Sequence, residues 1–112
     1  MDKIAIVGLS CLFPDAKNSH EFWQNLIARK NSTSEITFSD LGVEPEVFYD
    51  PIKGKTDKFY SRQGGFIRDF EFNASEFNLP RELIDTLDDT YKWSLYVTKQ
   101  ALAQSGYISN QS

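Results

Sequence analysis

The strongest hydrophobic pattern in the chain is a continuous apolar run near its amino terminus. Ile4–Val7 is rich in β-branched residues and ends at Gly8. This pattern is typical of a short strand that is buried on both faces. Such a strand needs neighbours on each side, so we expect residues 4–7 to lie inside a sheet whose other strands are not encoded here.

Capping residues and helical spacing predict a first helix over about residues 19–30. Asn18 is a good N-cap, and Glu21 follows three positions later, as in a capping box. The apolar residues that follow fall on one helical face: Phe22, Trp23, Leu26 and Ile27.

Two more helices are predicted near the carboxyl end. Pro80 suits the first turn of a helix that ends at about Thr86. Asp88 or Asp89 caps a longer helix to about Ser105, which stops at Gly106. Apolar residues cover much of the circumference of this last helix, which predicts packing on more than one side.

The segments between these helices have weaker patterns. Residues 32–58 are loop-like, with a brief helix near Pro45–Phe48, and residues 68–77 are irregular. Residues 58–67 fit a strand that is bent at Gly64-Gly65. The pattern therefore predicts an α+β fold with a few short strands and about three helices, and a polar tail at residues 109–112 that frays.

Composition narrows the class of protein. The chain has 112 residues, of which 40% are hydrophobic and 14% aromatic, with a net charge of −4 and one cysteine. It is one domain at most, and no basic stripe supports nucleic-acid binding. One cysteine excludes an internal disulfide and a cysteine-based zinc site. The apolar run is too short to span a membrane, so we expect a cytoplasmic protein.

The residues that could carry chemistry have simpler explanations. A nucleophilic Cys11 would need a base, and His20 is separated from it by a loop and a cap, so we expect Cys11 to be a buried filler and His20 a surface residue. Gly8 lacks the further glycines of a dinucleotide fingerprint and is expected to serve a turn or packing. Gly64-Gly65 is expected to permit close backbone approach or a positive φ rather than to contact a ligand.

Acidic and aromatic residues have structural explanations too. Capping and the helix dipole account for the carboxylates of Glu82, Asp85, Asp88 and Asp89. Phe22-Trp23 and Trp93 are expected to be core anchors first and interface anchors second. We therefore assign no catalytic, cofactor-binding or metal-binding residue to this chain.

The order of these segments resembles the N-terminal part of a β-ketoacyl synthase domain of the modular polyketide synthase type. The resemblance rests on residues 4–14, Glu21-Phe22-Trp23, the Tyr60 to Phe72 segment with Gly64-Gly65-Phe66-Ile67, and Leu79-Pro80-Arg81-Glu82. Residues 87–93 depart from the Asp-Pro-Gln-Gln-Arg stretch of typical polyketide synthases. Together with residues 22–26 and 54–60, they look closer to bacterial polyunsaturated fatty acid synthases.

The resemblance implies a fragment of a thiolase-like fold, with residues 1–108 as an incomplete ketosynthase domain. The parent enzyme would be an acyltransferase that performs decarboxylative Claisen condensation, with malonyl groups on the phosphopantetheine of a carrier protein. Its partners would be the rest of the synthase, the carrier protein and a second copy of the enzyme in a homodimer. The cysteine and two histidines of that family are absent here, so we expect this chain alone to be inactive.

A second hypothesis treats the chain as a non-catalytic docking module of a multienzyme synthase. Its aromatic content and its lone apolar strand would then be covered by a partner surface. A self-contained domain should be a stable monomer in solution, whereas a severed piece should self-associate.

Overall fold

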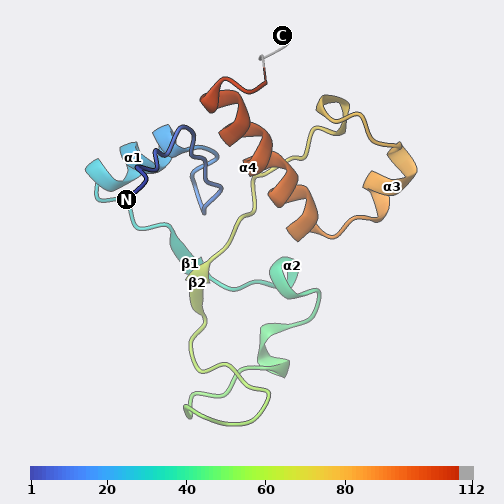
Figure 1. The fold of residues 1–112 in the computed structure, drawn as a ribbon. Helices are drawn as coiled ribbons and strands as arrows, with labels where there is room; N and C mark the ends of the chain where they lie inside the picture. Colours follow the sequence, from blue (N-terminus) through green and yellow to red (C-terminus); the bar gives the residue numbers. More distant parts are fainter. Residues whose placement is uncertain (109–112) are drawn as a thin grey trace.

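The computed structural model describes residues 1–108 and shows a small α+β arrangement (Figure 1). The expected polar tail at residues 109–112 lies outside this range. The helices and strands, in chain order, are α1 (Ser19–Ile27), β1 (Thr33–Glu35), α2 (Phe38–Leu41), β2 (Gln63–Gly65), α3 (Arg81–Thr86) and α4 (Asp89–Ser105). Short 3-10 turns, η1 and η2, occupy Pro45–Val47 and Ala74–Glu76. Strands β1 and β2 pair antiparallel, with Ser34 opposite Gly64.

The predicted strand at Ile4–Val7 is not formed in this chain. The segment has no strand partner, and Ile4 and Ile6 are 95% and 86% exposed. A strand exists only through hydrogen bonds to another strand, and none of residues 1–108 pairs with this segment. The prediction of a strand is therefore wrong for the chain by itself.

Helix α1 begins where predicted and ends earlier. The side chain of Asn18 accepts a hydrogen bond from the Glu21 amide at 2.8 Å, which confirms the predicted N-cap. The helix ends at Ile27, three residues before the predicted limit, because Arg29 adopts a left-handed conformation with φ 53°. The amides of Arg29 and Lys30 then donate to Leu26 and Asn25, a Schellman-type ending.

Helices α3 and α4 confirm the two predictions near the carboxyl end. Pro80 precedes α3 as its N-cap rather than sitting inside its first turn. The Asp88 side chain accepts from the Thr90 amide at 2.8 Å, and Gly106 ends α4 with φ 82°.

The long middle segment is more regular than predicted. The brief helix near Pro45 is confirmed as η1, but β1 and α2 were not foreseen. The strand expected over residues 58–67 is reduced to β2, because β1 offers only three residues to pair with. Residues 36–62 extend from this ribbon as an arm (Figure 1).

Helix α4 is the element on which distant segments meet. The Leu9 amide donates to the Gln104 side chain at 2.6 Å, and the Ser10 hydroxyl donates to the Val97 carbonyl. The ring of Tyr96 lies 4.8 Å from that of Phe70, edge to face. The Tyr96 hydroxyl donates to the Lys17 carbonyl. Contacts from residues 9–17 and from residue 70 thus converge on one helix.

A guanidinium clamp joins β1, α2 and the segment after β2. Arg68 donates through Nε and Nη2 to the two carboxylate oxygens of Asp40, at 2.9 and 2.6 Å. It also donates to the Ser34 hydroxyl and the Glu35 carbonyl, and its guanidinium lies 4.9 Å from the Phe66 ring centre. This fork geometry is available to arginine and not to lysine.

The chain is expanded for its length. Its radius of gyration is 18.0 Å, whereas a compact domain of this size has about 13 Å. Within residues 1–108 only Ala16, Pro45 and Ile84 are buried. The chain by itself therefore lacks a core of the usual size.

We predict that Arg68→Lys releases α2 from the ribbon. A lysine cannot bind both Asp40 oxygens together with Ser34 and Glu35, so the turn that ends at Gly42 should open more often. Hydrogen exchange of the Gly42 amide, which donates to Phe38 at 2.7 Å, should accelerate by about tenfold. Arg62→Lys is the matched control, since Arg62 pairs with Glu35 and Glu46 instead. Equal acceleration in both variants would contradict the clamp.

The Arg68–Asp40 clamp should also weaken at low pH. The hydrogen bond from Arg68 is the main reason why the pKa of Asp40 lies well below its ordinary value of 3.8. A carboxylate with a lowered pKa contributes stability that is complete above the unfolded pKa and is lost as the pH falls towards the folded one. Protection of the Gly42 amide should stay constant from about pH 8 to 5 and weaken only below about pH 4. Asp40→Asn should remove both the protection and its acid dependence.

A side chain at Gly8 should detach the N-terminal segment from α4. A Cβ built at this position collides with the backbone carbonyl oxygen of Ala101, which cannot move without distorting the helix. In Gly8→Ala, exchange of the Leu9 amide should rise by about tenfold. Ala5→Val, on the exposed part of the same segment, is the control and should leave it unchanged. Unaltered Leu9 protection in Gly8→Ala would show that the segment is held elsewhere.

Candidate assembly interface

Cys11 and His20 lie in environments that do not favour nucleophilic chemistry. Cys11 is half-buried, and burial raises the pKa of its thiol above the ordinary value, which disfavours the thiolate. His20 is exposed in the first turn of α1, as expected of a surface histidine. In residues 1–108 no group of three or more His, Cys, Asp or Glu side chains is placed to hold a metal ion.

Gly64 and Gly65 allow close packing of neighbouring segments. A Cβ at Gly65 would lie 3.1 Å from the Pro14 ring, and one at Gly64 would lie 3.0 Å from the Phe66 ring. Neither glycine has a positive φ. Of the two roles expected for this pair, close approach is confirmed. It brings the Phe13-Pro14 and Gly64-Gly65-Phe66 segments together.

The carboxylates at the helix starts act as caps or first-turn charges. Asp88 accepts from the Thr90 amide, and this hydrogen bond is the main cause of the lowered pKa of Asp88. Asp89 lies in the first turn of α4, and Glu82 lies in that of α3. The capping and dipole explanation therefore accounts for these three residues and is wrong for Asp85, which lies in the last turn of α3.

The aromatic residues divide into packed and exposed ones. Phe22 packs against Phe13 with ring centres 4.8 Å apart, but Trp23 on the same helix is 59% exposed. Trp93 is half-buried. The expectation that Trp23 is primarily a core anchor is wrong for this chain, because none of residues 1–108 covers that side of α1. Its second expected role, as an interface anchor, fits its exposure.

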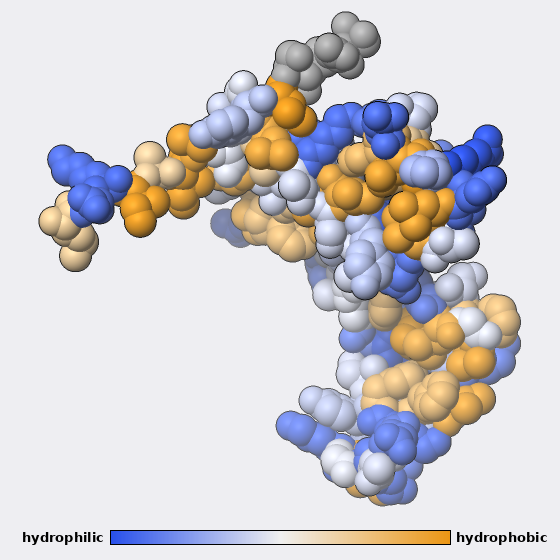
Figure 2. Space-filling model, turned by 45° about the vertical axis from the view of Figure 1, so that its right-hand side comes forward, coloured by the Kyte–Doolittle hydropathy of each residue, from blue (hydrophilic) through white to orange (hydrophobic). Residues whose placement is uncertain are grey.

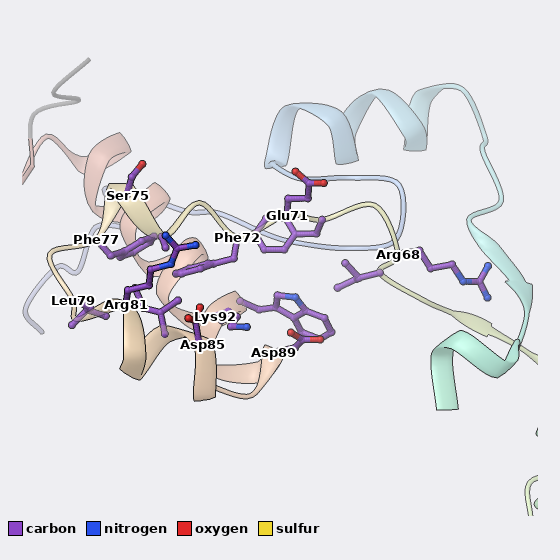
Figure 3. A pocket seen from close by; sticks show the side chains of 15 residues that line it. Arg68, Glu71, Phe72, Ser75, Phe77, Leu79, Arg81, Asp85, Asp89 and Lys92 are labelled. Atoms are coloured by element: carbon purple, nitrogen blue, oxygen red, sulfur yellow. The ribbon is translucent and has the colours of Figure 1, made fainter. Parts of the chain in front are cut away.

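An open cavity of about 820 Å³ lies between residues 67–79 and helices α3 and α4 (Figure 3). Phe72 and Phe77 stack within it, with ring centres 4.8 Å apart. Charged residues of both signs surround these rings, namely Arg68, Glu71, Arg81, Asp85, Asp89 and Lys92. Among the described residues that line the cavity, Ser75 alone has a hydroxyl, and this hydroxyl donates to the Asn73 side chain at 2.7 Å rather than to a base. The cavity is a mixed surface without a nucleophile–base pair.

The prominent feature of the molecule is its exposed apolar surface. Figure 2 shows hydrophobic residues in several patches on one face. One set belongs to the N-terminal apolar segment, which comprises Ile4–Leu9 and in which Val7 and Leu9 are also more than half exposed. A second set lies along α1, and a third lies between α3 and α4. Exposed apolar patches on a soluble protein mark interaction surfaces, so these faces indicate an interface.

No helix in residues 1–108 has the length and apolar character needed to cross a membrane.

Comparison with known proteins identifies the chain's relatives. The family model for the β-ketoacyl synthase N-terminal domain matches residues 1–112. Polyketide synthase PksL of Bacillus subtilis is 34% identical over 107 residues, which is 95% of this chain and 2% of that protein. One subunit of the polyunsaturated fatty acid synthase from a Thraustochytrium species is 31% identical over 104 residues, covering 93% of this chain and 4% of its own length.

A solved structure agrees with these relatives. A PfaC ketosynthase–chain length factor matches 92% of this chain with a TM-score of 0.81 and 44% identity. The match covers 11% of that structure's chain. These relatives are large synthases, and the present chain spans only a small part of each. At this level of identity both fold and family are shared: the chain belongs to the β-ketoacyl synthase family, and its match lies in the N-terminal domain of that family.

Proposed function

We propose that residues 1–108 form the first part of a β-ketoacyl-[acyl-carrier-protein] synthase domain in a polyunsaturated fatty acid or polyketide synthase. The observation that carries this proposal is the structural match to a ketosynthase–chain length factor at 44% identity. Its exposed apolar faces support the proposal, because they suit a chain that packs against the rest of such a domain.

The proposed reaction is decarboxylative Claisen condensation. An acyl group rides as a thioester on a cysteine of the parent enzyme, and a malonyl thioester on the carrier protein loses carbon dioxide. The resulting enolate attacks the acyl carbonyl, so that a carbon–carbon bond forms and the bond to the cysteine sulfur breaks. Two histidines stabilise the enolate oxygen, as hydrogen-bond donors do at developing negative charge.

This chain would contribute scaffold to that reaction. Cys11 is disfavoured as the nucleophile by the raised pKa of its thiol, and His20 is exposed on a different element. The acyl-carrying cysteine and both histidines would therefore come from outside residues 1–108. We propose no catalytic, cofactor-binding or metal-binding residue within the chain.

The proposal includes partners and location. The phosphopantetheine thioester of an acyl carrier protein would be the substrate, and two copies of the parent enzyme would form a homodimer. A cytoplasmic setting is supported by the single cysteine, which suits a reducing compartment.

A free-standing docking module is the second candidate. Its support is the exposed aromatic residues, Trp23 among them. A module that folds by itself should however be compact, and the radius of gyration of 18.0 Å speaks against that. We therefore favour the ketosynthase assignment.

The proposal predicts that the chain alone is inactive and that a hybrid is active. In the hybrid, residues 1–112 replace the matching segment of the related ketosynthase–chain length factor, and condensation is measured with acyl and malonyl carrier-protein thioesters. The isolated chain should give no turnover, because it lacks the nucleophile. Turnover by the isolated chain, or a folded but inactive hybrid, would contradict the assignment.

Cys11→Ala in the hybrid tests the identity of the nucleophile. The rate of condensation should stay within about twofold of the unsubstituted hybrid, because Cys11 is a packing residue. Loss of a true nucleophile costs many orders of magnitude. A loss above about a hundredfold in a hybrid that still folds would place Cys11 in the reaction.

A further inference from the structure

We draw no further inference here: the strongest candidate, the patch of exposed apolar side chains on the arm over residues 36–62, carries none, because nothing in the structure shows what covers it.

Discussion

The structure depends on the packing of distant segments against α4. Close approach of Gly8 to Ala101, the Ser10–Val97 hydrogen bond and the Phe70–Tyr96 ring contact all use this helix. Each contact joins parts of the chain that are far apart in sequence. Ordering those parts costs conformational entropy, and the contacts can offset that cost only where the helix is already well formed. The caps at Asp88 and Gly106 are therefore central, since they define the helix on which the other contacts form.

Local signals in the sequence were sufficient for the helices. The Asn18 and Asp88 caps, the Gly106 ending and the apolar spacing act within a few residues, so α1, α3 and α4 could be predicted without tertiary information. The expected α+β class and the resemblance to ketosynthases are confirmed by the family and structural matches. A capping signal at Thr37 and Asp40 could also have revealed α2, because the Thr37 amide donates to that carboxylate at 2.8 Å.

Features that depend on distant partners could not be predicted in the same way. The apolar pattern of Ile4–Val7 predicts a strand, but a strand also needs partner strands, and residues 1–108 supply none to this segment. The Arg68–Asp40 clamp spans 28 positions, and no local pattern marks that pairing. Helix α1 ends at Ile27 because Arg29 adopts a left-handed conformation. Residues other than glycine seldom adopt this conformation, so the sequence does not indicate this ending.

The separation between the N-terminal segment and its helix has a consequence for synthesis. Ser10 leaves the ribosome 87 positions ahead of Val97, the residue to which it bonds. At ordinary elongation rates this interval is on the order of ten seconds. During that time an uncharged, β-branched stretch is exposed without the helix that it packs against, and such stretches are prone to aggregate. Nascent-chain protection by chaperones should matter most in that interval.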